Sequence, residues 1–178
     1  MKGTQVKRGN SGFTLMELLI SIAIIGIFAT MALPAMNSLY TSNKVYGLSE
    51  RVQAEIAWAR TQAILTSEPV TLSFNPVAQW CYGFENISAQ VGCDCSNPND
   101  CLVDGTEKIN NVLAFDGTTL ATTLAANNIT FDSRGIANIN NSSITLTDTN
   151  NNSVVLNLNA LGRVSPCSNA LPHYDACP

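Results

Sequence analysis

The apolar stretch GFTLMELLISIAIIG, residues 12–26, predicts a long helix near the start of the chain. Its one charged side chain, Glu17, is followed by 26 residues, Leu18–Asn43, without a Lys, Arg, Asp or Glu. A helix of about 20 apolar residues crosses a bilayer core of roughly 30 Å. The sequence therefore predicts that residues 13–39 form a transmembrane helix.

Charge is distributed unevenly around this run. Three basic residues precede it, Lys2, Lys7 and Arg8, and the first 16 residues contain no acid. Basic residues before an apolar span mark the side that stays in the cytoplasm, so the remainder is expected across the membrane. The 178-residue chain has a net charge of −4, and without its first eight residues 6 basic stand against 13 acidic side chains. Such an acidic body disfavours general nucleic-acid binding, which depends on Lys and Arg neutralising phosphates.

Glu17 is the unusual residue of the apolar segment. A carboxylate at the edge of hydrocarbon costs several kcal/mol unless it is paired. An ordinary secretory signal has a shorter apolar region followed by a small-residue cleavage site, and neither feature is present here. Glu17 is therefore a functional candidate.

The hexapeptide from Gly12 to Glu17 resembles the processing site of type IV prepilins and type II secretion pseudopilins. The resemblance implies that a prepilin peptidase cuts after Gly12 and methylates the new amino-terminal residue, Phe13. It also implies that Glu17 acts in assembly. The new α-amine stays largely cationic at neutral pH, so Glu17 of one subunit can pair with the amine of a neighbour and set axial register. Gly26 and Pro34 lie where that family has helix-perturbing residues.

Beyond the apolar run the pattern becomes one-sided. Apolar residues recur at steps of three or four, which predicts an amphipathic helix over residues 40–67 that ends before Pro69. The stripe is Val45, Leu48, Val52, Ile56, Ala59 and Ala63.

After Pro69 the period approaches two, which predicts a β-rich head over residues 68–178. Asp148–Asn152 is expected to be a hairpin turn. The fold class is therefore α+β, with one long helix packed on antiparallel sheet. The expected strands are Val70–Phe74, Gln79–Phe84, Val112–Phe115, Asn128–Phe131, Ile136–Ile139, Ser143–Thr147, Ser153–Leu158 and Arg163–Ser165.

Six cysteines follow the apolar segment, an even number that predicts disulfides in an oxidising compartment. Fifteen pairings are available, and spacing favours Cys167 with Cys177. The polar stretch from Asn86 to Gly105 is expected to be a stapled loop. A zinc site is the rival interpretation, although the paired spacing of a zinc ribbon is missing and His173 is the only histidine. The cysteines are Cys81, Cys93, Cys95, Cys101, Cys167 and Cys177.

The head resembles the GspH/FimT group of minor pilins and pseudopilins. Two segments carry this resemblance, Ile129–Gly135 and Leu161–Ser165. It implies a structural subunit, a minor pilin or pseudopilin that helps initiate or tip a filament with other pilin subunits. The alternative is a DNA-binding pilin of a competence pilus, for which Arg163 is the one matching arginine. The tail beyond Arg163 has Asp175 and no Lys or Arg, so DNA is disfavoured.

No catalytic set emerges, and the chain is not expected to be an enzyme or to need a cofactor. No metal site is predicted, although Asp94, Asp100 and Asp104 leave a calcium loop open as an alternative. Residues 1–12 are the expected leader peptide. Before assembly the subunit is expected in the bacterial inner membrane as a single-pass protein with its head in the periplasm. Afterwards it belongs to a pilus on the cell surface or to a periplasmic pseudopilus.

Overall fold

The computed structural model describes residues 13–77, 80–86, 92–110 and 117–178. One helix, α1 (Leu15–Thr66), is followed by ten strands and a short 3-10 helix, η2 (Ala125–Asn127), in the described part of the chain. The architecture is α+β, as predicted. The strands are β1 (Val70–Asn75), β2 (Cys81–Glu85), β3 (Leu102–Val103), β4 (Thr106–Glu107), β5 (Ile109–Asn110), β6 (Thr118–Thr122), β7 (Asn128–Phe131), β8 (Ser142–Asp148), β9 (Ser153–Leu158) and β10 (Val164–Cys167).

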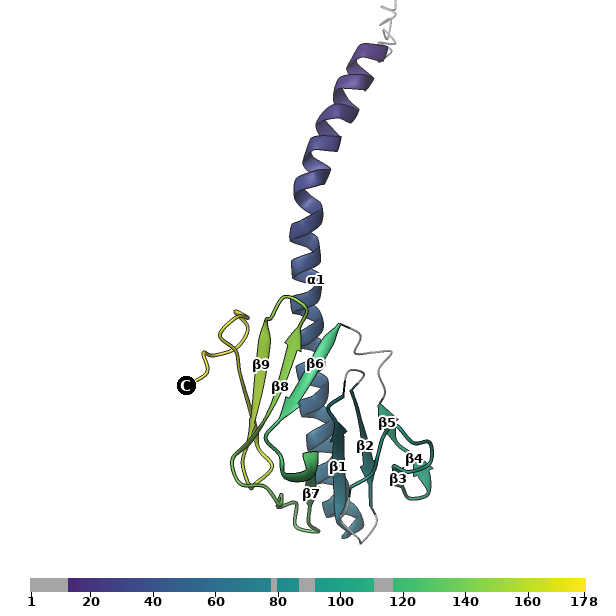
Figure 1. Cartoon of the computed structure of the whole chain (residues 1–178), viewed down its shortest axis with the longest axis vertical. Helices are drawn as coiled ribbons and strands as arrows, with labels where there is room; N and C mark the ends of the chain where they lie inside the picture. The colour runs from purple at the N-terminus through teal and green to yellow at the C-terminus, as the bar shows by residue number, and fades with distance from the viewer. Residues whose placement is uncertain (1–12, 78–79, 87–91, 111–116) are drawn as a thin grey trace, which may run out of the picture. The chain divides into compact units, whose positions relative to one another are not determined.

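The chain divides into two compact units, Met1–Leu39 and Tyr40–Pro178. The first consists, where it is described, of the start of α1, and the helix continues through Gly26 and Pro34. Across the described residues, no helix is both long and apolar enough to cross a membrane. The second unit, here called the head, holds the end of α1 and all the strands (Figure 1).

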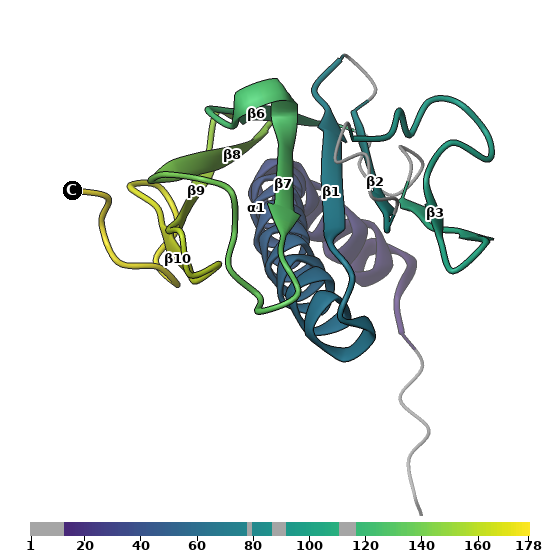
Figure 2. The ribbon, with the colours of Figure 1, turned by 90° about the horizontal axis from the view of Figure 1, so that it is seen from below.

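Two antiparallel four-stranded sheets form the head, with strand orders β5-β2-β1-β7 and β10-β9-β8-β6. The chain moves from the first sheet to the second at β6, returns at β7 and leaves again at β8. A two-stranded β3–β4 pair lies apart from both sheets. Figure 2 shows α1 lying against the sheets, with β1 and β7 on one side and β8, β9 and β10 on the other.

The predicted apolar stripe of α1 is buried, with exposed fractions of 6% or less from Val45 to Ala63. It belongs to one core with the inward side chains of both sheets, among them Tyr82, Phe131 and Leu156. The helix then ends at Thr66, where Ser67 adopts a left-handed conformation (φ 58°) two residues before Pro69.

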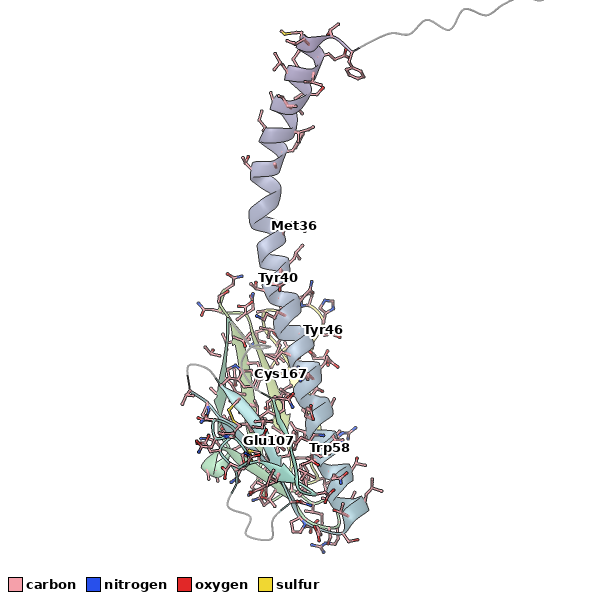
Figure 3. All side chains as sticks on the ribbon, turned by 90° about the vertical axis from the view of Figure 1, so that its right-hand side faces the viewer. Met36, Tyr40, Tyr46, Trp58, Glu107 and Cys167 are labelled. Carbon is pink, nitrogen blue, oxygen red and sulfur yellow. A yellow bond between two sulfur atoms is a disulfide. The ribbon has the colours of Figure 1, made fainter. Side chains whose placement is uncertain are left out.

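The polar face of α1 also contacts the edge strand β5 at Asn110 and at the residue before the strand, Lys108. The Lys108 ammonium lies 3.2 Å from the centroid of the Trp58 ring (labelled in Figure 3). Asn110 accepts a hydrogen bond from Arg51 and donates one to Glu55 at 3.5 Å. Cation–π and polar contacts therefore connect this edge of the first sheet to α1.

Strands β1 and β2 are buried on both faces. One face meets α1, and a lobe of residues 92–107 covers the other. Disulfides Cys81–Cys95 and Cys93–Cys101 hold this lobe, so the predicted stapled loop is present. Its close approach requires Gly83, because a Cβ there would lie 2.3 Å from the Cys101 sulfur.

The carboxyl-terminal loop is closed by the Cys167–Cys177 disulfide that the spacing favours, and the described cysteines are all paired. The loop is bound to α1 through Tyr174, whose hydroxyl lies 2.6 Å from Ser49 Oγ and donates to Glu50 at 3.0 Å. Burial raises the pKa of Tyr174 to about 12. The His173 ring is exposed and lies 5.1 Å from the Tyr46 ring.

One predicted strand is wrong. Ile136–Ile139 forms a single bridge, between Phe131 and Ala137, instead of a strand. Asn138 explains this, because its side-chain oxygen accepts the Thr130 N–H at 2.8 Å in place of a backbone carbonyl. The expected strand Val112–Phe115 lies outside the described residues. The short strands β3, β4 and β5 and the longer β6 were not predicted.

The lobe also buries a carboxyl group, that of Glu85, which is 6% exposed. Glu85 Oε1 accepts the Gly92 N–H at 2.7 Å. Burial nevertheless raises the pKa of this carboxyl, and the hydrogen bond offsets only part of the effect.

Replacing Glu85 with Gln is therefore expected to raise the unfolding temperature of the solubilised full-length chain at pH 7. A raised folded pKa stabilises the fold below the unfolded pKa, and this contribution is lost as pH rises through the folded pKa. The advantage of Gln should thus disappear below about pH 4, the unfolded value. Thermal unfolding at a series of pH values measures this difference in unfolding temperature between the variant and the parent chain. The exposed Glu68→Gln is the control, and a Glu85→Gln gain independent of pH would contradict the explanation.

Candidate assembly surfaces

The expected processing segment lies at the start of α1. Thr14 caps the helix, because its Oγ1 accepts the backbone N–H of Glu17 at 3.2 Å. Gly12 lies outside the described residues, and Phe13 is 77% exposed. Helix formation therefore begins two residues after the expected cleavage point. The sequence order Thr-Leu-Met-Glu is that of a capping box, a signal that the interpretation as a processing motif overlooked.

Glu17 lies in the first turn of α1 and is exposed. A carboxylate there is stabilised by the helix dipole by about 0.3–1 kcal/mol. Placing the same charge in hydrocarbon costs several kcal/mol. The dipole of its own helix therefore offsets only part of the cost of placing the Glu17 charge in hydrocarbon.

At the other end of α1, two turns of the head meet around Arg60. In the first turn, Asp132 Oδ1 accepts the N–H groups of Arg134 at 2.9 Å and Ile136 at 2.8 Å. These hydrogen bonds, that from Ile136 foremost, and the Arg134 guanidinium at 2.8 Å lower the pKa of Asp132. Gly135 occupies the left-handed region at φ 75°.

The second turn repeats this arrangement. Asn159 Oδ1 accepts the N–H groups of Leu161 at 3.1 Å and Arg163 at 3.0 Å, and Gly162 has φ 69°. The turns are joined by the hydrogen bond that the Ala137 N–H donates to the Ala160 carbonyl at 2.9 Å. Both segments that carry the GspH/FimT resemblance thus contribute to one corner of the head.

Arg60 lies between the two glycines. Its Nε donates to the Gly135 carbonyl at 3.1 Å. A Cβ on Gly135 would lie 3.2 Å from the Arg60 stem and 2.7 Å from Ile64, and a Cβ on Gly162 would lie 2.5 Å from Phe131. Arg60 and Ile64 were not singled out from sequence, because their importance depends on two turns that are remote in the chain.

Arg163 belongs to the second turn, and it lines a polar cleft of about 540 Å³. It is the one cationic side chain among the lining residues, which are otherwise hydroxyl and amide groups with Leu158. A single cation provides one phosphate contact, which is little for DNA.

The aspartates of the calcium alternative lie in the disulfide lobe. Among the described residues, no group of three His, Cys, Asp or Glu side chains is placed to hold a metal ion. The aspartates of the lobe accept hydrogen bonds instead. Asp94 accepts the Ser96 N–H at 2.9 Å, Asp100 accepts the Asp94 N–H at 2.6 Å, and Asp104 accepts from Asn86 at 2.7 Å.

Comparison with known families agrees with this layout. Residues 48–162, more than half of the chain, match the family described as type II transport protein GspH. The chain belongs to the GspH family. Its match begins in the buried stripe of α1 and ends at Gly162. Residues 7–33 also match the prokaryotic N-terminal methylation motif, which includes the segment from Gly12 to Glu17. The chain is therefore a structural subunit of the minor pilin and pseudopilin type, and it assembles with other pilin-like subunits.

Two solved structures share the fold. One is the type IV minor pilin FimU of Pseudomonas aeruginosa, with 14% identity, a TM-score of 0.51, and coverage of 69% of this chain and 87% of FimU. The other is the minor pseudopilin EpsH from the type 2 secretion system of Vibrio cholerae, with 10% identity, a TM-score of 0.53, and coverage of 72% and 99%. No curated protein matches the chain in sequence.

Gly162→Ala tests the close approach around Arg60. The variant is expected to lose roughly 1–3 kcal/mol more stability than Gly105→Ala, because overpacking adds to the backbone strain that both share. Gly105 is a matched control, with φ 74° and no neighbour within 4 Å of an added Cβ. Urea unfolding of the full-length chain, followed by tryptophan fluorescence, measures the difference. Equal losses would show that the contact with Phe131 relaxes freely.

Proposed function

We propose that this GspH-family chain helps to initiate or tip an extracellular pilus or a secretion pseudopilus. The observation that carries the proposal is the apolar surface of α1. Large apolar side chains from Phe13 to Phe28 are about half exposed or more, and they lie on every side of the helix. A helix that is apolar all round needs an apolar environment or a partner. A bundle of such helices in a filament core supplies one.

The proposal includes processing and membrane insertion. Prepilin peptidase cuts after Gly12, and Phe13 becomes the methylated amino terminus. Before assembly, residues 13–39 reside in the inner membrane and the head lies in the periplasm. Two features support this order, the uncharged run of 26 residues from Leu18 and the three disulfides, which form in an oxidising compartment. Gly26 and Pro34 weaken the helix where it bends or leaves the bilayer.

Glu17 then provides the axial register. The helix dipole offsets only part of its desolvation, so the α-amine of a neighbouring Phe13 supplies the rest. A subunit that lacks this carboxylate remains stable in the membrane. It also lacks the charge whose cost in the bilayer favours transfer from the membrane into the filament.

Glu17→Ala is therefore expected to deplete the subunit from filaments by about tenfold or more, which corresponds to a loss of roughly 1.4 kcal/mol. Sheared filaments or pseudopili are quantified by mass spectrometry against the membrane fraction. Intact mass should show loss of residues 1–12 plus one methyl group in both parent and variant. Glu68→Ala, an exposed carboxyl on the head, is the control. Undiminished incorporation of Glu17→Ala would remove the basis for the assembly role.

DNA capture is the second candidate, since Arg163 lines an open polar cleft. With one cation in the cleft, we expect weak retardation of duplex DNA, with a logarithmic salt slope of about −1. Gel shift with the solubilised full-length chain and Arg163→Ala measures this. Tight binding that is lost in the variant would make DNA uptake the better description.

A further inference from the structure

The head exposes apolar side chains at the corner formed by its two glycine turns. Ile64 is 47% exposed, Ile136 39% and Leu161 62%. Arg60 and Arg134 flank them, and the Arg134 side chain is 76% exposed. These five residues are called the two-turn patch.

Close contacts between the two turns and α1 make the patch a single surface. A Cβ on Gly135 would touch both Ile64 and the Arg60 stem, so the first turn lies directly on α1. A Cβ on Gly162 would lie 3.5 Å from the Arg60 stem, which brings the second turn to the same side chain. The Ala137–Ala160 hydrogen bond joins the residues next to Ile136 and Leu161. Three segments remote in sequence therefore hold the patch rigidly.

The fold itself does not need these exposed side chains. Ile136 and Leu161 occupy corners of turns, positions where polar residues are usual. The turns are held by the side chains of Asp132 and Asn159 and by left-handed glycines, and none of these interactions involves the two apolar side chains. Their exposure on a rigid surface is typical of a contact site.

The charges of the patch indicate what kind of partner surface it can bind. Between Tyr40 and Pro178 the sequence has 6 basic and 12 acidic residues, and two of the basic ones lie here. Asp132 pairs with Arg134, whereas Arg60 pairs with no carboxylate among the residues that the structure describes. The patch is thus positive on an acidic head. Arginine beside apolar side chains is the composition enriched at protein–protein contacts.

We propose that the two-turn patch docks the acidic face of a neighbouring pilin-type head. This inference rests on the proposed function. The neighbour inserts apolar side chains against Ile136 and Leu161 and places carboxylates opposite Arg60 and Arg134. DNA suits the patch poorly, since three apolar side chains occupy it and its one guanidinium without a carboxylate partner in the described part of the chain provides a single phosphate contact.

The same composition disfavours a symmetric contact. In an isologous interface each copy presents the same surface, so two patches that each carry an excess of positive charge would face each other. A head-to-tail contact has no such conflict. The chain's own acidic lobe, with Asp94, Asp100 and Glu107, shows the kind of surface that a pilin-type head can offer. Head-to-tail contacts are also those that extend into a filament.

Site-specific photocrosslinking in cells that assemble the filament tests the proposal. A benzophenone amino acid replaces Leu161 in the full-length chain, and Val77, also exposed (56%) but outside the patch, is the matched control. We expect an adduct from position 161, identified by mass spectrometry as another pilin-type subunit, at a yield about tenfold above that from position 77. Ile136→Asp should reduce this adduct by on the order of tenfold, as loss of a central contact does.

Each other outcome decides against the proposal. If the chain is recovered from filaments and position 161 gives no adduct, an adduct with DNA, lipid or an unrelated protein, or no more adduct than position 77, the patch is not the docking surface. An unchanged adduct in Ile136→Asp overturns it as well. If the chain is absent from filaments, the proposed function itself fails. Thermal unfolding of Ile136→Asp, expected within a few degrees of the parent, confirms that the variant is folded.

Discussion

The buried face of α1 is the constraint on which the head depends. Both four-stranded sheets place their inward side chains in one core with that face, although each sheet has its own hydrogen-bonded order. Fully burying a Val, Leu or Ile side chain contributes about 1.5–3 kcal/mol. Val45, Val52 and Ile56 are each at most 1% exposed, so this single face accounts for much of the stability of the unit. It also determines which helix residues remain outside, including Arg60 and Ile64.

The disulfide lobe follows from the same arrangement. Because α1 covers one face of β1 and β2, the strands are left with a second face that carries Thr71, Ser73 and Glu85. The lobe covers this face, where Ser73 Oγ accepts the Cys93 N–H at 3.0 Å. The Thr71 hydroxyl is satisfied by the neighbouring strand instead, since its oxygen lies 3.0 Å from that of Thr130 in β7. Glu85 is the residue least suited to such burial. A region that holds a buried carboxyl and little apolar area needs covalent ties, which the two disulfides provide.

The sequence allowed prediction of features that depend on local periodicity or on one short motif. The stripe of α1, the β8–β9 hairpin at Asp148 and the methylation motif are of this kind. Strand β6 was missed because its Thr and Ala residues give a weak apolar alternation. Ile136–Ile139 misled because its side chains do alternate between exposed and buried, but the Asn138 side chain takes the place of one backbone carbonyl in the pairing with β7. The patch around Arg60 was out of reach for a different reason. No one of its three segments has a distinctive pattern until the fold places them together.

The turns of the head show that a left-handed backbone conformation and a lack of room for a Cβ are two separate requirements. Asp148 organises a third turn of the same kind, in which its Oδ1 accepts the N–H groups of Asn150 and Asn152 at 2.8 Å. The left-handed position of that turn is taken by Asn151 (φ 62°), whose side chain is exposed. The left-handed conformation alone therefore does not require glycine. Gly135 and Gly162 are required because Ile64 and Phe131 leave no room for a Cβ. In a solvent-facing turn Asn suffices, whereas glycine marks the two turns that pack most closely, the first against Ile64 of α1 and the second against Phe131 of β7.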